Sequence, residues 1–130
     1  MKTCIMLVGS ELLNGMMLDT NSIYIAEELN KYGMNISNKI VVGDKIEDIV
    51  QALSYAKKNN DLIIISGGLG PTIDDLTRDA ISKFCDKELI LNEDEYKKIE
   101  EKFEKYGIKI PESNKRQVMF PEGSIIIDND

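Results

Sequence analysis

The chain has 130 residues and a formal net charge of −7, from 16 basic and 23 acidic residues. This length fits one domain, so we expect residues 1–130 to form a single unit. The acidic balance disfavours a general nucleic-acid binder, because such proteins present basic surfaces. No apolar run approaches the roughly 20 residues of a membrane span, so we expect no membrane partner.

Strands and helices alternate along the chain. The predicted strands are apolar runs, and the predicted helices carry an apolar stripe at helical spacing. In chain order, we predict a strand at 3–8, a helix at 21–32, a strand at 35–42, a helix over 46–56, a strand at 61–66, a helix at 75–85, a helix over 96–106, a helical turn at 114–119 and a strand at 124–127. This alternation predicts a three-layer α/β/α sandwich with a mainly parallel sheet.

Helix-capping residues refine three of these boundaries. Asp44 and Glu47 predict a variant capping box before the helix over 46–56. Asn92 predicts the N-cap of the helix over 96–106, and Gly107 its end.

The absence of histidine excludes several kinds of chemistry. The chain itself cannot supply a Ser-His-Asp or Cys-His nucleophile, or a histidine-rich zinc site. Carboxylates, hydroxyls, backbone amides, lysines and arginines remain. Cys4 lies in a predicted strand and Cys85 at a predicted helix end. Two such cysteines favour a reduced, cytoplasmic location over a disulfide scaffold.

The segment SGGLGPTIDDLTR, residues 66–78, joins a buried strand to a helix. Glycines at such a junction let backbone N–H groups approach a ligand closely, and a helix N-terminus favours anions. The segment is not a P-loop, because it has no Gly-Lys-Ser/Thr end, and it is not a GxGxxG dinucleotide motif. The alternative is a tight turn in which Thr72 or Asp74 caps the helix.

Three loops follow the carboxyl ends of the predicted strands: residues 9–21, 43–45 and 66–77. In parallel sheets, ligands bind at this edge. The acidic residues of each loop also have a structural interpretation. Those of the first loop can be solvated carboxylates, that of the second a helix cap, and those of the third partners of the helix dipole. All acidic candidates are hard oxygen donors, which suit Mg²⁺ or Mn²⁺ bound weakly and completed by substrate phosphates: Glu11, Asp19, Asp44, Asp74 and Asp75.

Three motifs carry a resemblance to a known family. They are GSELLNG with DTNS at residues 9–15 and 19–22, GGLGPT with DDLTR at 67–72 and 74–78, and NKRQ with FPEG at 114–117 and 120–123. With this spacing, the chain resembles the molybdopterin-binding (MoCF, MogA-like) domain, and within it the N-terminal domain of CinA-type competence/damage-inducible proteins. The family also continues past the position of Asn129 with a glycine-containing loop, so we expect this chain to be a truncated domain.

The resemblance implies a phosphate site for a nucleotide or a pterin. Members of the family join AMP to the molybdopterin phosphate with the help of Mg²⁺, and CinA-type domains are associated with ADP-ribose pyrophosphatase activity. Carried over by position, the implied catalytic residues are Asp75 and Asp44. The implied phosphate or nucleotide ligands are Gly67, Gly68, Gly70, Thr72, Glu11, Gly15, Asn21 and Asn114, and the implied metal ligands are Asp19, Asp44, Asp74 and Asp75.

Three functions remain open at this point. The first is a metal-dependent pyrophosphatase acting on ADP-ribose-like dinucleotides, whose activity the truncation puts in doubt. The second is a molybdopterin-binding or adenylyltransferase-like module of cofactor biosynthesis. The third is an oligomerisation domain, for which Ile125, Ile126 and Ile127 would form an exposed sheet edge that pairs in a homodimer.

Overall fold

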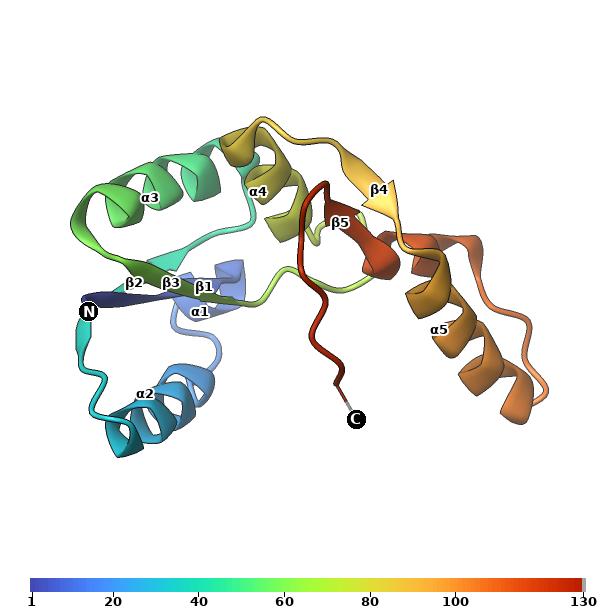
Figure 1. Ribbon diagram of the computed structural model, residues 1–130, viewed down its shortest axis with the longest axis horizontal. Helices are drawn as coiled ribbons and strands as arrows, with labels where there is room; N and C mark the ends of the chain where they lie inside the picture. The colour runs from blue at the N-terminus through green and yellow to red at the C-terminus, as the bar shows by residue number, and fades with distance from the viewer. Residues whose placement is uncertain (130) are drawn as a thin grey trace.

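The computed structural model describes residues 1–129. Its elements are β1 (Thr3–Val8), α1 (Ser10–Leu13), α2 (Asn21–Lys31), β2 (Ile36–Val42), α3 (Ile46–Asn59), β3 (Leu62–Ser66), α4 (Thr77–Cys85), β4 (Leu89–Leu91), α5 (Glu93–Lys105), a 3-10 helix η1 (Glu112–Val118) and β5 (Met119–Pro121). Figure 1 shows α3 and α4 on one face of the central sheet and α2 on the other. The predicted three-layer α/β/α architecture is therefore confirmed.

The central sheet has three parallel strands in the order β2-β1-β3. Val8 of β1 is opposite Val42 of β2, and Met6 is opposite Ile65 of β3. Every residue of β1 is buried, as expected for a central strand covered on both faces. Because the strands are parallel, the loops that follow them all leave from the same edge.

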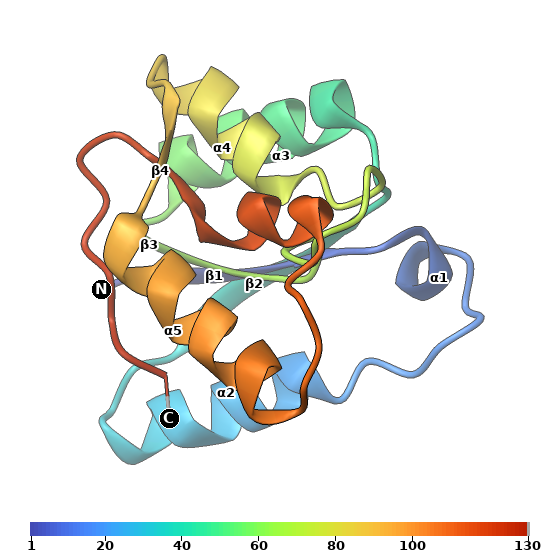
Figure 2. The same cartoon turned by 90° about the vertical axis from the view of Figure 1, so that its right-hand side faces the viewer.

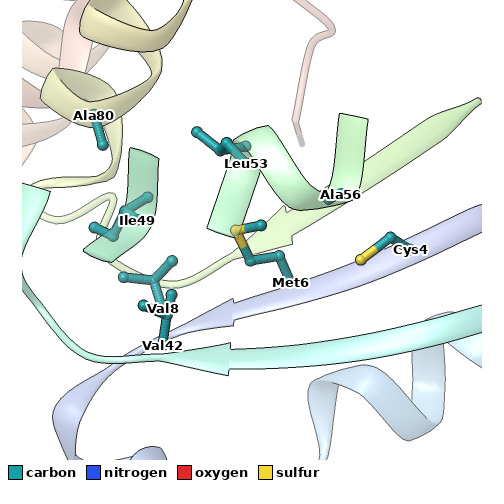
Figure 3. Close-up of a cluster of buried hydrophobic side chains, with 8 residues drawn as sticks. All are labelled: Cys4, Met6, Val8, Val42, Ile49, Leu53, Ala56 and Ala80. Carbon is teal, nitrogen blue, oxygen red and sulfur yellow. The ribbon is translucent and has the colours of Figure 1, made fainter. Parts of the chain in front are cut away.

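The main core lies between the sheet and the helices α3 and α4. Side chains alternate along a strand, so Cys4, Met6 and Val8 share one face of β1. They pack with Val42 of β2 and with a buried stripe of α3 and α4, as Figure 3 shows: Ile49, Leu53, Ala56 and Ala80. This apolar layer fixes α4, and with it the glycine loop that precedes the helix.

The second part of the chain adds a smaller unit beside the sheet. Strands β4 and β5 form an antiparallel pair, with Ile90 opposite Phe120. In Figure 1, β4, β5 and α5 lie to the right of the central sheet, and in Figure 2, which looks from that side, α5 lies in front of the sheet. The predicted cap of α5 is confirmed, because Asn92 accepts a hydrogen bond from the N–H of Glu95 at 3.0 Å. Gly107, with φ 68°, follows the end of the helix as predicted.

Three sequence-based predictions were wrong. Residues 124–127 form no strand; the short strand is Met119–Pro121, which pairs with β4, an element that the sequence did not predict. The helix expected from Asp75 begins at Thr77, because residues 72–75 form a separate turn. The capping box at α3 is also absent: its N-cap is Lys45, and no side chain caps it.

No helix in the described range is long and apolar enough to cross a membrane.

Candidate functional site

The glycine loop leaves β3 in a conformation that only glycine accepts without strain. Gly67 and Gly68 have φ of 97° and 66°, in the left-handed region. A Cβ on Gly67 would lie 2.1 Å from the carbonyl oxygen of Val8, and one on Gly68 would lie 2.2 Å from Oγ1 of Thr77. The loop therefore packs directly against β1 and against the start of α4, with no room for side chains.

Thr77, the first residue of α4, connects the helix to this loop. Its side chain is fully buried. The hydroxyl donates to the carbonyl of Gly67 at 2.7 Å, and the Thr77 N–H donates to the carbonyl of Gly68 at 3.1 Å. Both glycine carbonyls are thus paired with Thr77, which fixes the orientation of their peptide units.

The second half of the loop closes on Asp75. Its Oδ2 accepts hydrogen bonds from the N–H of Thr72 at 2.9 Å and from the Thr72 hydroxyl at 2.7 Å. Although burial alone would raise the pKa of Asp75, these hydrogen bonds and the charge of Arg78 lower it. Asp75 therefore stays ionised and also organises the loop. The alternative prediction, in which Thr72 or Asp74 caps α4, was wrong, because the N-cap is Leu76 and no side chain caps the helix.

The loops after β1 and β2 are joined by a reciprocal pair of hydrogen bonds. The Ser10 N–H donates to Oδ2 of Asp44 at 3.1 Å, and the Asp44 N–H donates to Oγ of Ser10 at 3.3 Å. This pairing explains why Asp44 does not cap α3. It also uses one oxygen of the predicted catalytic carboxylate to hold two loops together.

The start of α2 lies next to the end of β3. The side-chain amide of Asn21 donates to the hydroxyl of Ser66 at 3.0 Å. Asp19, just before the helix, accepts hydrogen bonds from the N–H and hydroxyl of Ser22, and pairs with the ammonium of Lys39 at 3.0 Å. Burial alone would raise the pKa of Asp19, but the Ser22 hydrogen bonds and Lys39 lower it.

A pocket of about 230 Å³ opens between the first loop and the glycine loop. It contains five of the site residues predicted from the sequence, which come from segments more than forty residues apart: Glu11, Asp19, Asn21, Gly67 and Gly68. The other predicted residues do not line it. They are Gly15, Asp44, Gly70, Thr72, Asp74, Asp75 and Asn114, and the Asn114 side-chain amide instead donates to Gln117 at 2.8 Å.

The predicted metal ligands are not gathered into one cluster. Among residues 1–129, no group of three histidine, cysteine, aspartate or glutamate side chains is placed to hold a metal ion. Asp44 and Asp19 are engaged with Ser10 and with Ser22 and Lys39, whereas Asp74 is exposed. These donors fit a Mg²⁺ ion only in its usual protein mode, with one or two carboxylates plus phosphate oxygens and water.

Two arginines at this site had no assigned role in the sequence analysis. Arg78 is 9% exposed, and its guanidinium donates to the carbonyls of Leu69, Gly70 and Gln117. Arg116 donates to Asp79 and to the carbonyl of Asp75. Their position inside the DDLTR and NKRQ motifs could have marked these arginines as candidates. A sequence does not show, however, which backbone carbonyls a guanidinium contacts.

Comparison with known proteins places the chain in a family. A family model described as "Probable molybdopterin binding domain" matches residues 4–127. A "CinA-like protein" of Fusobacterium nucleatum is 53% identical over 100% of this chain, and a "Putative competence-damage inducible protein" of Caldicellulosiruptor saccharolyticus is 42% identical over 96% of it. The chain spans 32% and 30% of the length of these two relatives.

Solved structures agree with this assignment. The protein CinA from Thermoplasma acidophilum, described as of unknown function, superposes with a TM-score of 0.87 at 30% identity, covering 98% of this chain and 75% of that one. The molybdopterin biosynthesis enzyme MoaB of Thermus thermophilus shares the fold, with a TM-score of 0.64 at 21% identity over 91% of this chain and 72% of that one. The chain therefore belongs to the molybdopterin-binding domain family, and over its whole length it is similar to the N-terminal part of CinA-like proteins.

Proposed function

We propose that this domain binds the phosphate groups of a nucleotide at the glycine loop. The observation that carries the proposal is the conformation of Gly67 and Gly68 at the end of β3, beside the pocket that Asn21 and Glu11 also line. Backbone without side chains allows an anion to approach closely, and the start of α4 adds its positive dipole end.

In the CinA-like parent protein, we propose that this site hydrolyses ADP-ribose-like dinucleotides. Water attacks one phosphorus atom of the diphosphate, the bridging P–O bond breaks, and AMP and ribose 5-phosphate leave with the protons of that water. The glycine-loop amides are suited to stabilise charge on the departing phosphate. We propose that Asp75, which stays ionised, orients the attacking water by accepting a hydrogen bond from it, because a lowered pKa makes this carboxylate a weak base.

The proposed cofactor is a weakly bound divalent metal, Mg²⁺ or Mn²⁺. The exposed Asp74 would hold it together with Asp75, whose Oδ2 also accepts hydrogen bonds from Thr72; Asp44 and Asp19 pair with residues of other elements. When bound, such an ion neutralises phosphate charge and lowers the pKa of a water ligand. Because phosphate oxygens would complete its coordination, we expect weak binding to the chain alone and tighter binding with nucleotide present.

The test measures AMP release from ADP-ribose by this chain and by the full-length protein, with Mg²⁺ or Mn²⁺. Asp75→Asn should reduce turnover by at least tenfold without unfolding the domain. Asp86→Asn, at the far end of α4, is the matched control because it makes the same chemical change away from the loop. Calorimetry of ADP-ribose binding separates a loss of affinity from a loss of turnover. Absence of AMP release by the full-length protein with every metal would contradict the hydrolase proposal.

A second candidate is a molybdopterin-binding or adenylyltransferase-like function. The observation that favours it is the family match over residues 4–127, together with the shared fold of MoaB. The same glycine loop would hold a pterin phosphate, which would replace water as the nucleophile: its oxygen would bond to the α-phosphorus of a nucleoside triphosphate, and the bond to the β-phosphate would break with release of pyrophosphate. Competition between molybdopterin and ADP-ribose for this chain discriminates the two functions.

We also propose that the domain self-associates as a homodimer and works in the cytoplasm. Ile125 and Ile127 are 91% and 86% exposed, so their side chains are accessible to a second copy of the chain. Both cysteines are free thiols, consistent with a reducing compartment. Sedimentation at micromolar concentration tests the dimer, and Ile125→Ser with Ile127→Ser should shift it to monomer if these side chains form the contact.

A further inference from the structure

Arg78 connects the glycine loop to η1, which lies about forty residues further along the chain. Its Nη1 donates to the carbonyl of Gly70 at 3.2 Å, and its Nη2 donates to the carbonyls of Leu69 and, at 3.4 Å, of Gln117. The Arg78 side chain is buried, so its N–H groups have little access to water and depend on these carbonyls as hydrogen-bond partners. One planar guanidinium thus sets the spacing between two backbone segments.

Arg116 makes the reverse connection, from η1 back to the glycine loop and α4. Its Nη2 donates to the carbonyl of Asp75 at 3.1 Å and to Oδ2 of Asp79 at 3.0 Å. Among residues 1–129, its buried Nε has no partner, so the contacts of Nη2 determine where this side chain lies. Arg78 of α4 is therefore bonded to the backbone of η1, and Arg116 of η1 is bonded to the backbone just before α4.

We propose that Arg78 and Arg116 are positioning residues that together hold the glycine loop and Asp75 in the phosphate-binding conformation, with η1 as their common support. The role follows from what they contact: the carbonyl of Gly70 before the 72–75 turn and that of Asp75 at its end, rather than the pocket itself. It also gives the NKRQ segment a task, because that segment supplies both Arg116 and the Gln117 carbonyl. The proposal deepens the proposed function and rests on it for its functional consequence.

The experiment compares four variants of this chain that each remove one positive charge. Arg78→Met and Arg116→Met remove the two positioning residues, with methionine close to arginine in length. Lys83→Met and Lys115→Met are matched controls on the same two helices. Lys83 makes a surface ion pair with Glu47, and Lys115 pairs with Glu112 and lies 6.0 Å from the centre of the Tyr96 ring. Arg78→Lys is a further variant that keeps the charge but replaces the planar fork by a single ammonium.

Two readouts are measured for every variant. The first is amide exchange and chemical shift at residues 67–70 and at Thr72, whose N–H is hydrogen-bonded to Asp75, compared with those of the β1 amides, in the ligand-free chain. We expect at least tenfold faster loop exchange in Arg78→Met and Arg116→Met, unchanged protection of β1, and no change in either lysine control. The second is the affinity for ADP-ribose, which should fall at least fivefold in the arginine variants only, with Arg78→Lys failing to restore it.

The outcomes separate the two proposals. Unchanged loop exchange and shifts in both folded arginine variants would overturn the positioning role, whether or not ADP-ribose binds. Equal loosening of β1 and the loop would overturn it too, because that result indicates general destabilisation. A third outcome is that the loop loosens in the arginine variants but the wild-type chain binds no ADP-ribose. That result supports the positioning role and counts against the proposed ligand.

Discussion

The hydroxyl of Thr77 donates to the carbonyl of Gly67 at 2.7 Å, across ten residues of chain. The same threonine begins α4, and its N–H pairs with the carbonyl of Gly68. The helix start is therefore built onto the loop by two hydrogen bonds from one residue. The hydroxyl of Thr77 can be removed with little change of shape, because valine is nearly the same size as threonine.

Replacing Thr77 by valine should lower the free energy of unfolding by about 1–3 kcal/mol, because the part-buried Gly67 carbonyl loses its donor while the volume is nearly kept. Thr77→Ser keeps the hydroxyl, and at the loop it should behave more like wild type. Urea denaturation measures the stability, and the amide shift of Gly68 reports the loop. A valine variant with wild-type stability and an unchanged Gly68 shift would show that this bond does not hold the loop.

Gly67→Ala should be among the most destabilising single changes in the chain. Its Cβ would lie 2.1 Å from the backbone oxygen of Val8, and its φ is 97°. We expect a loss of about 3 kcal/mol or more, from steric overlap and backbone strain together. Gly123→Ala is the control, because it shares a positive φ but has nothing within 4 Å of its Cβ, and it should cost about 1–2 kcal/mol. Equal costs from thermal or urea unfolding would refute the steric argument.

The contact between Asp19 and Ser22 should make stability depend on pH. The folded-state pKa of Asp19 is lowered, so its contribution is present above the unfolded value of about 3.9 and disappears as pH falls through the folded value. Ser22→Ala removes the buried hydroxyl donor and should cost about 1–2 kcal/mol at pH 7. The difference from wild type should shrink at pH 3 or below. Urea titrations at both pH values check this, with Ser113→Ala as an exposed control; a pH-independent difference would contradict it.

The two cysteines should differ sharply in reactivity. Cys4 is fully buried in β1, and burial raises the pKa of its thiol, whereas Cys85 is exposed at the end of α4. A thiol reagent at pH 8 should therefore label one site rapidly in the native chain and two in denaturant. Cys85→Ser should abolish the rapid phase. Fast labelling of Cys4 in that variant would reveal frequent opening of the core.

Much of the central layer was predictable from the sequence because its signals are local. The apolar run at 3–8 and the stripe from Ile46 to Ala56 have the periodicities of a buried strand and an amphipathic helix, and both elements formed as expected. The strand expected at 124–127 did not form, because an apolar run alone does not determine which other strand it pairs with. Residues 89–91 and 119–121 pair instead, and no local sequence pattern predicts a pairing between segments so far apart in the chain.

The candidate site shows the same division. The tight junction between β3 and α4 was predictable from its glycines, because only glycine tolerates such close contact between backbone segments. The assignment of Asp44 as a cap failed, since the competing donor was the Ser10 N–H on another loop. The arginines were missed for a similar reason: apart from Asp79, their acceptors are backbone carbonyls, which every residue has and no sequence motif distinguishes.

The order of the central sheet also affects how the chain folds as it is made. β1 precedes both of its partners, and it pairs with β2 and β3 only after residues 42 and 66 have been synthesised. Until residue 42 has been made, the run from Cys4 to Val8 has no strand beside it, and until residue 59 it lacks the cover of α3, although it becomes the most buried segment of the domain. Nascent chains that stop short of β3 should therefore bind chaperones or aggregate, and chains that include α4 should resist protease.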